Sequence, residues 1–317
     1  LSGQYLIIQF LGTNLLIYFV ILAVKNGYTE IMPIKEFHLQ CLFILGLGVK
    51  SAIFGVHFWL PPVHSQAPAP VSALFSGWVV KLGFIMFLRL LPAGNILLLL
   101  LGILNVFYGG IKALKAKDYK VLLAYSSISQ LGFIAIGIGS GTVIGYLGSI
   151  LHIIAHGLAK TMLFMGSGYL LDIYKSRTIY DFKGEEKRSG IIDLSILTGF
   201  GSLMGFPLLA GFNSKHLIRS AFHIKHLFNM KMIMPSWFIS IFQRFSFLTT
   251  GHIFEIILFV GSFITGLYSI RFLYWCVFKN LQSKIASQKI EIKKLYSKEI
   301  YLMVTLVPVI VLLLLIG

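Results

Sequence analysis

Long runs of apolar residues follow one another along most of the chain. A run of about 20 apolar residues is long enough to cross the roughly 30 Å hydrocarbon core of a membrane as a helix. A membrane β-barrel would need segments of about ten residues that alternate between apolar and polar, and these runs do not alternate. The pattern therefore predicts an all-α polytopic membrane protein with about nine transmembrane helices. The expected spans are Tyr5–Val24, His38–Trp59, Val71–Leu91, Ile96–Lys115, Tyr119–Ile138, Thr142–Ile173, Ile191–Phe222, Phe254–Phe278 and Tyr301–Ile316.

The composition supports this fold class and gives a meaning to the basic charge. Hydrophobic residues make up 57% of the chain and charged residues 12%, and the formal net charge is +16. Soluble domains carry about twice that fraction of charged residues. Basic residues of a membrane protein gather on its cytoplasmic or matrix side. We therefore expect membrane lipids, and not nucleic acid, as the partners of the basic stretch Lys279–Glu299.

Four lysines lie inside the apolar runs: Lys50, Lys81, Lys160 and Lys215. A lysine at the centre of a membrane costs roughly 3 kcal/mol, so such residues usually face a protein interior or a water-filled path and often handle ions or protons. The alternative is that the side chain reaches the lipid headgroups from near a helix end. That alternative suits Lys215 better than the other three, because its helix could end near Asn213.

The spans contain almost no carboxylates that could neutralise these lysines. Asp193 and Glu255 both lie at predicted helix ends. Burial without a partner destabilises the charged ammonium group, so that it releases and rebinds a proton more readily. A proton relay therefore has a physical basis. A neighbouring chain could also supply carboxylates, and the two interpretations are compatible.

One predicted helix carries a stripe of titratable side chains. His152, His156 and Lys160 are spaced by four residues and share one helix face. The alternative is that each imidazole only forms a hydrogen bond with a neighbouring helix. No metal is expected there, because no acidic or cysteine ligand accompanies the histidines. Ser126 and Ser127 in the preceding span could hold water for proton transfer or simply join helices.

Two of the predicted spans contain helix-breaking residues next to a lysine. Proline and glycine interrupt the backbone hydrogen bonds, which membrane proteins tolerate where the freed groups face a cavity or neighbouring protein. Interrupted helices in corresponding halves of a chain indicate an ion pathway, although each break alone is also compatible with a packing kink. The breaking regions contain Gly55, His57, Pro61 and Pro62 after Lys50, and Gly205, Pro207, Gly211 and Asn213 before Lys215.

Redox and nucleotide chemistry have no recognisable site in the sequence. Cys41 and Cys276 lie apart in apolar runs, without metal-ligand or iron–sulfur spacing. The glycines between Gly132 and Gly148 are scattered through helices and form no phosphate-binding loop. We therefore expect no cofactor and no metal on this chain.

Four segments in a fixed order resemble a known family. The run GLGVKSAIFGVHFWLPPVHSQAPAPVSALFSGWVVKLGFIMFLRLL from Gly46 is similar to the central signature of the antiporter-like subunits of respiratory complex I and of multisubunit sodium/proton antiporters. The later motifs of that family are matched by DYKVLLAYSSISQLGF from Asp118, IAHGLAKTMLFMGSGYL from Ile154 and GFPLLAGFNSK from Gly205. The resemblance covers roughly residues 40–275.

The resemblance implies a fold and a role for the buried cations. In this family two inverted repeats, each with a broken helix, form proton half-channels that a polar axis joins. Lys50 matches the lysine of the first broken helix, Lys81 that of the next helix, and Lys215 the charged residue of the second broken helix. His156 and Lys160 fall on the helix that contributes to the axis. We expect one transmembrane domain over residues 1–317, with the rest of a first repeat at about 1–91, a second repeat at about 96–278 and a terminal helix at about 300–317.

The same resemblance implies a function within a larger assembly. The expected role is proton translocation in the membrane arm of NADH:ubiquinone oxidoreductase, with NADH, FMN, iron–sulfur clusters and ubiquinone bound by partner subunits. The alternatives are a structural membrane-arm subunit that does not pump and a subunit of a multisubunit cation/proton antiporter. The richness in Phe, Ile, Leu and Lys suits an organellar genome and hence the mitochondrial inner membrane, with a bacterial plasma membrane as the alternative.

The choice of subunit and the amino-terminal region lead to two further expectations. By this resemblance, the lysine at Lys81 argues against subunit 5, and the lysine at Lys215 argues against subunit 4. Subunit 2 therefore fits best. The stretches IAHGL and YKSRTIYDFKG, however, look more like subunit 4. The family pairs the lysine matched by Lys50 with a glutamate several helices upstream, where this sequence has about one helix. Glu30 and Glu36 lie in a predicted loop and are poor substitutes. We therefore expect a separate chain to carry the missing helices and their glutamate.

Overall fold

The computed structural model describes residues 2–182, 190–222, 250–278 and 309–316, and this part of the chain is a bundle of helices. It contains no strand beyond an isolated bridge between Asp118 and Thr178, so the all-α prediction is confirmed. The segment 309–315 is also helical. The other elements are α1 (Ser2–Lys25), α2 (Phe37–Ser51), α3 (Leu60–Gln66), α4 (Ala69–Gly77), η1 (Val79–Lys81), α5 (Leu82–Leu90), α6 (Ile96–Lys115), α7 (Tyr119–Gly139), α8 (Val143–Tyr174), η2 (Ile179–Asp181), α9 (Gly190–Met204), α10 (Ala210–Ser220), α12 (Thr250–Leu273) and η4 (Tyr274–Phe278).

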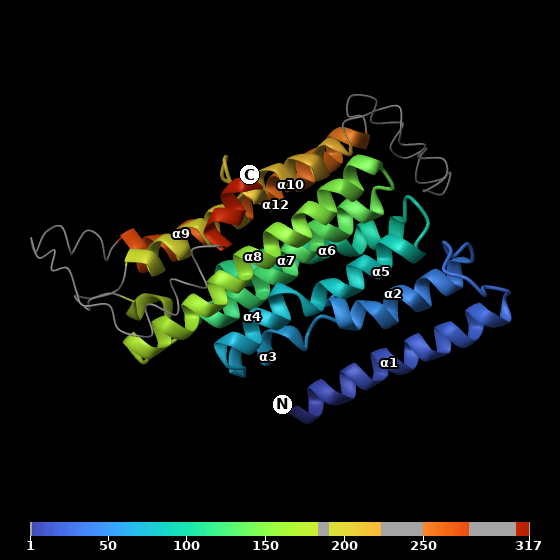
Figure 1. Cartoon of the computed structure of the whole chain (residues 1–317), viewed down its shortest axis with the longest axis horizontal. Coiled ribbons are helices and arrows are strands. Elements are labelled where there is room, and N and C mark those ends of the chain that lie inside the picture. The colour runs from blue at the N-terminus through green and yellow to red at the C-terminus, as the bar shows by residue number, and fades with distance from the viewer. Residues whose placement is uncertain (1, 183–189, 223–249, 279–308, 317) are drawn as a thin grey trace, which may run out of the picture.

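The helices lie side by side with α7 and α8 at the centre (Figure 1). The first helix α1 runs along one edge of the bundle, and α9, α10 and α12 lie along the opposite edge. Burial agrees with this order. In an apolar stretch of 18 residues taken from each helix, 89% of the stretch is buried in α7 and only 17% is buried in α1. Six described helical segments are long and apolar enough to span a membrane, and α2 and α9 are shorter apolar helices.

Side-chain caps explain where the three central helices begin. Asn95, Asp118 and Thr142 each accept a hydrogen bond from a backbone amide three residues further along. Such a cap satisfies one of the amides that a helix start leaves without an intrahelical acceptor. The predicted starts at Ile96, Tyr119 and Thr142 therefore agree with the structure to within one residue.

Both predicted helix breaks are present. The first break follows Ser51, where Ala52 (φ 52°) and Gly55 (φ 93°) adopt left-handed conformations, and α3 then begins with prolines in its first turn. The second break follows Met204, with positive φ angles at Gly205 (83°) and Leu208 (73°) before α10. The span expected over His38–Trp59 therefore contains α2 and the break that follows it, and the span expected over Ile191–Phe222 is divided into α9 and α10.

A third break, within the span Val71–Leu91, was not predicted. Helix α4 ends at Gly77, and a single 3₁₀ turn with Lys81 as its last residue leads into α5. A Cβ atom at Gly77 would lie 2.7 Å from the Thr161 hydroxyl oxygen, so α4 packs closely on α8 at this point. The span itself is present as the helical segment Ala69–Leu90. The 3₁₀ turn inside it was not predicted, because the run contains no proline.

The carboxyl-terminal predictions are only partly within the described residues. The span Phe254–Phe278 corresponds to α12 and the single π-helical turn η4. The last span, Tyr301–Ile316, is described only from residue 309 onward. The basic stretch Lys279–Glu299 lies outside the described residues.

Glycines hold α6 and α7 in close contact. A Cβ atom at Gly132 would lie 2.5 Å from the Gly102 carbonyl oxygen and 2.7 Å from the Val106 amide nitrogen. A Cβ atom at Gly109 would lie 2.5 Å from the Ser129 amide nitrogen. Small residues at such positions let transmembrane helices approach closely. The central helix α7 therefore depends on glycine for its position.

We expect Gly132→Ala to destabilise the protein by about 1–3 kcal/mol, because rigid backbone of α6 occupies the space that the methyl group needs. Gly266→Ala in α12 is the control, since nothing lies within 4 Å of a Cβ atom there. That control should be neutral or stabilising by up to about 1 kcal/mol. The free energy of unfolding in mixed micelles measures both variants, and equal effects would contradict the close packing of α6 and α7.

Candidate functional site

Three of the four intramembrane lysines are buried and the fourth lies at the edge of the bundle. Lys81 is 1% exposed, Lys160 is fully buried and Lys215 is 9% exposed. Lys50 is only half-buried, in the seam between α1 and α2. The alternative that Lys215 reaches the headgroups from a helix end does not hold, because its side chain lies in the interior.

Lys81 and Lys215 each bind backbone oxygens at the end of a broken helix. Nζ of Lys81 donates hydrogen bonds to the carbonyl oxygens of Ser76 (2.5 Å) and Gly77 (2.6 Å), where α4 ends. Nζ of Lys215 donates to the Leu203 carbonyl oxygen at 2.6 Å, where α9 ends. The last carbonyls of a helix lack intrahelical donors and carry partial negative charge. Each break therefore supplies the acceptors that its lysine needs.

Lys160 and Lys50 also bind uncharged acceptors. Nζ of Lys160 donates to the Leu123 carbonyl oxygen at 2.7 Å and to the Ser126 hydroxyl at 2.5 Å. Nζ of Lys50 donates to the Gln9 carbonyl oxygen at 3.0 Å and to the Thr13 hydroxyl at 2.9 Å. Within the described ranges, none of the four lysines forms a hydrogen bond or ion pair with a carboxylate. The protons on these lysines are thus held by neutral groups.

Serine hydroxyls connect the lysines of neighbouring helices. Ser126 binds Lys160, and the adjacent Ser127 hydroxyl lies 2.7 Å from the Ser76 hydroxyl on α4. The Ser76 carbonyl oxygen is in turn an acceptor for Lys81. The two serines singled out in the sequence therefore lie between Lys160 and Lys81.

The histidine stripe continues this row toward Lys215. The rings of His152 and His156 are nearly parallel, with centroids 6.2 Å apart and an interplanar angle of 5°. Nδ1 of His152 lies 2.8 Å from the hydroxyl of Ser214, the residue before Lys215. A Cβ atom at Gly157, the residue after His156, would lie 3.9 Å from Nζ of Lys81. The stripe on α8 thus lies between the lysines of the two broken helices.

The remaining candidates shape the two breaks. His57 is buried at the first break, with its ring centroid 5.4 Å from that of Phe54 and 4.6 Å from that of Tyr108. Pro61 is in the first turn of α3, and Pro207 lies between α9 and α10. These three residues are not part of the row of lysines and histidines.

His64 is a buried titratable residue that the sequence analysis missed. Its ring is fully buried and stacks on Phe164, with centroids 4.9 Å apart. Nζ of Lys160 lies 5.9 Å from the same Phe164 ring, on α8. His64 was missed because it falls between the predicted spans, and its closeness to Pro61 and Pro62 was the available signal. The row thus extends past Lys160 to α3.

The described residues contain no group of three or more His, Cys, Asp or Glu side chains that could hold a metal ion. Cys41 is half-buried on α2, and Cys276 is buried in η4. What the arrangement provides is a set of proton-binding nitrogens on neighbouring helices.

The fold and this row define an integral membrane protein of helices with a buried line of basic groups at its centre. Residues 2–242 match the family described as NADH:quinone oxidoreductase/Mrp antiporter, transmembrane, and the chain belongs to that family. The predicted resemblance to antiporter-like membrane subunits of complex I is therefore confirmed.

Three relatives show the range of this family. Formate hydrogenlyase subunit 3 of Escherichia coli is 33% identical over 57% of this chain and 33% of its own length. NAD(P)H-quinone oxidoreductase chain 4 of Prochlorococcus marinus is 30% identical over 74% of this chain and 49% of its length. A putative antiporter subunit, mnhA2, of Staphylococcus aureus is 30% identical over 97% of this chain and 40% of its length. The chain thus spans between a third and a half of these relatives.

Solved structures support the same fold. A chain of the archaeal membrane-bound sulfane sulfur reductase, at 25% identity, superposes with a TM-score of 0.75 over all of this chain and 62% of its own length. A chain of respiratory complex I from Thermus thermophilus, at 23% identity, gives a TM-score of 0.76 over 99% of this chain and 64% of its own. The predicted antiporter-like fold is confirmed.

We expect Lys160→Met to be neutral or to stabilise the protein by up to about 4 kcal/mol, because the variant removes a buried charge without a charged partner. The Leu123 carbonyl oxygen keeps the hydroxyls of Ser126 and Ser127 as donors, each at 3.0 Å. Lys115→Met, at an exposed position at the end of α6, is the control and should have little effect. A large loss of thermal stability in detergent for Lys160→Met alone would mean that Lys160 is structural.

Proposed function

We propose that this chain is a proton-translocating subunit of the membrane arm of an NADH:quinone oxidoreductase. The observation that carries the proposal is the buried row of basic groups from His64 through Lys160, Lys81 and His156 to Lys215. Intramembrane ionisable residues are costly, and they are characteristic of proton relays. The names of several relatives support the same assembly, since they are chains of quinone oxidoreductases.

The hydrogen bonding of the row suits repeated proton transfer. Each lysine is held by carbonyl or hydroxyl oxygens, so its loss of a proton leaves no buried carboxylate without a counter-ion. A nearby positive charge disfavours the protonated form of the next group, so a proton that arrives at one group promotes release from its neighbour. A charge change that reaches one end of the row would in this way pass along it.

Redox chemistry belongs to partner subunits in this proposal. NADH, FMN, iron–sulfur clusters and ubiquinone would be bound by other chains of the complex, and this chain would contribute to the NADH:quinone reductase reaction only through proton movement. The other membrane-arm subunits and the surrounding lipids are the proposed partners. The complex I relatives above have the name chain 4, so the assignment to subunit 2 stays a prediction, as does the mitochondrial inner membrane.

In this proposal, Lys50 needs a carboxylate partner that the described residues do not supply. Lys50 lies in the seam between α1 and α2. The acidic residue at the start of α2 is Glu36, which directly precedes the helix. Glu36 precedes Lys50 by 14 residues, which is about 21 Å along the helix. It accepts a hydrogen bond from the Tyr28 hydroxyl at 2.6 Å, which lowers the pKa of Glu36. We propose that a helix outside these residues, predicted on a separate chain, brings a carboxylate to Lys50.

Two other functions have specific observations in their favour. The Staphylococcus antiporter subunit aligns with 97% of this chain, which supports a role in a multisubunit cation/proton antiporter. The peripheral position of Lys50 supports a structural subunit that no longer pumps. The native membrane complex can be isolated on a gel and stained for NADH oxidation. This experiment distinguishes the antiporter alternative from the proposed function, because an antiporter would migrate without that activity.

We expect Lys81→Met and Lys215→Met each to lower the proton-pumping rate of the reconstituted complex by about tenfold or more, because groups that transfer protons typically contribute at least that factor. Lys115→Met, which changes an exposed lysine of the same chain, should leave pumping unchanged. Pumping is measured as acidification of the vesicle lumen, with assembly of the complex checked on native gels. Unchanged pumping in both variants would leave the structural role as the better assignment.

We expect a structure of the assembled complex to place a carboxylate within about 4–6 Å of Lys50 Nζ, the range in which opposite charges favour each other's ionised form. The carboxylate should come from a helix packed on the exposed side of α1 and α2. A complex in which only lipid or apolar side chains cover Lys50 would contradict the proposed partner.

A further inference from the structure

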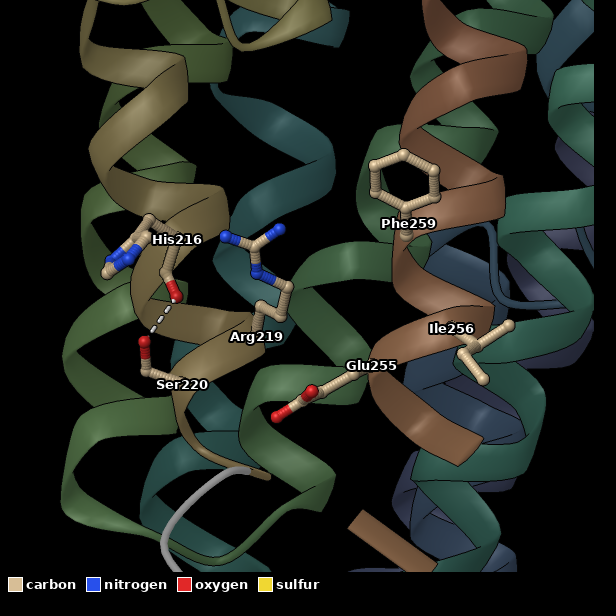
Figure 2. Close-up of a pocket in the computed structure, with 6 residues that line it drawn as sticks. All are labelled: His216, Arg219, Ser220, Glu255, Ile256 and Phe259. Carbon is tan, nitrogen blue, oxygen red and sulfur yellow. Dashed lines mark hydrogen bonds between the residues drawn. The ribbon is translucent and has the colours of Figure 1, made fainter. Parts of the chain in front are cut away.

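A cleft of about 440 Å³ opens between α10 and α12, next to the end of the row at Lys215. Figure 2 shows side chains from the last turns of α10 on one wall and from the first turns of α12 on the other. The volume is in the range typical of small-ligand sites. The residues that line the cleft are His216, Arg219, Ser220, Glu255, Ile256 and Phe259.

The cleft lies at the depth of the lipid headgroups. Helix α10 ends at Ser220, and α12 begins at Thr250. The amide of Ile218 packs beside Gly148, which is near the start of α8 at Val143. Three helix ends therefore meet near the cleft. Charged side chains at such ends meet the lipid–water interface.

Opposite charges occupy the two walls of the cleft. Arg219 extends from α10 and Glu255 from α12, and both side chains point into the space between the helices (Figure 2). Arg219 is exposed, and its guanidinium presents several donors in a planar fork that matches phosphate oxygens. The Glu255 carboxylate can accept hydrogen bonds from an ammonium group. Its Oε2 lies 3.6 Å from Nδ1 of His252, at the outer end of α12.

An exposed apolar stripe leads from this charged pair toward the membrane centre. Ile256, Phe259 and Phe263 on α12 are 53%, 62% and 61% exposed. Their spacing of three and four residues places them on one helix face. An acyl chain lying along this stripe would begin beside Glu255. The cleft thus offers a positive group for a phosphate, a negative group for an ammonium and an apolar surface for an acyl chain.

We propose that the cleft binds one phosphatidylethanolamine molecule. Its phosphate binds Arg219, its ammonium group donates to Glu255, and one acyl chain packs along Ile256, Phe259 and Phe263. An arginine alone would bind any phospholipid phosphate. Glu255 adds selectivity, because it repels anionic headgroups and because the quaternary amine of choline has no N–H donor. This site is independent of the proposed proton transfer.

The test uses the purified membrane complex that contains this chain. The complex is delipidated and then incubated with vesicles of equal parts phosphatidylethanolamine, phosphatidylcholine and phosphatidylglycerol. It is returned to detergent, and the lipids that it retains are counted by native mass spectrometry. We expect each wild-type complex to retain one more phosphatidylethanolamine molecule than a complex with Arg219→Gln. That variant should bind it about tenfold more weakly, since it loses a charge-assisted hydrogen bond.

Selectivity gives the sharper test. Glu255→Gln should lower the preference for phosphatidylethanolamine over phosphatidylglycerol by about tenfold, because it removes both the acceptor and the repulsion. His252→Gln, which keeps the carboxylate, and Arg89→Gln, which removes an exposed arginine from α5, should retain the wild-type lipid. Equal retention of all three lipids, or a preference that Glu255→Gln does not change, would overturn the proposal. Neither result would alter the expected pumping defects of the lysine variants.

Discussion

The structure depends on how it accommodates ammonium groups in the middle of a membrane without a carboxylate partner among the described residues. A buried lysine needs acceptors, and an interrupted transmembrane helix has carbonyl oxygens without donors. Lys81 at the end of α4 and Lys215 at the end of α9 satisfy both needs with the same hydrogen bonds. The breaks and these two lysines therefore stabilise each other. Lys50 lies beside the first break but binds acceptors on α1 instead.

The neutral acceptors have a second consequence, which concerns the movement of charge. A carboxylate would hold a lysine strongly in its protonated form, whereas carbonyl and hydroxyl oxygens favour that form less. The row remains effective only if α4, α8 and α10 keep their separation. Close packing provides that rigidity: the Ser214 hydroxyl links α10 to His152, and Gly77 lets α4 lie directly on Thr161 of α8.

Much of this arrangement could be predicted from local features of the sequence, and the exceptions are instructive. The breaks beside Gly55 and Gly205 could be predicted because glycine and proline mark them directly. The break before Lys81 could not, because the lysine itself supplies the donors that stabilise it and the run otherwise reads as one apolar helix. The half-burial of Lys50 was also beyond reach, since it depends on which helices cover α2 and not on the residues of α2.

The two edges of the bundle differ in how they expose a lysine to neighbouring protein or lipid. At one edge, α1 leaves much of its apolar surface open, and Lys50 lies in the seam beneath it. At the other edge, a cavity of about 160 Å³ between α10 and α12 reaches Lys215 beside Gly205 and Phe133. The buried row lies between these edges, so Lys215 is its member nearest to neighbouring protein or lipid, and Lys50 lies outside the row beside α1. A charge change outside the bundle would therefore act first on Lys50 or Lys215, while Lys81 and Lys160, screened by protein on all sides, respond to their neighbours in the row.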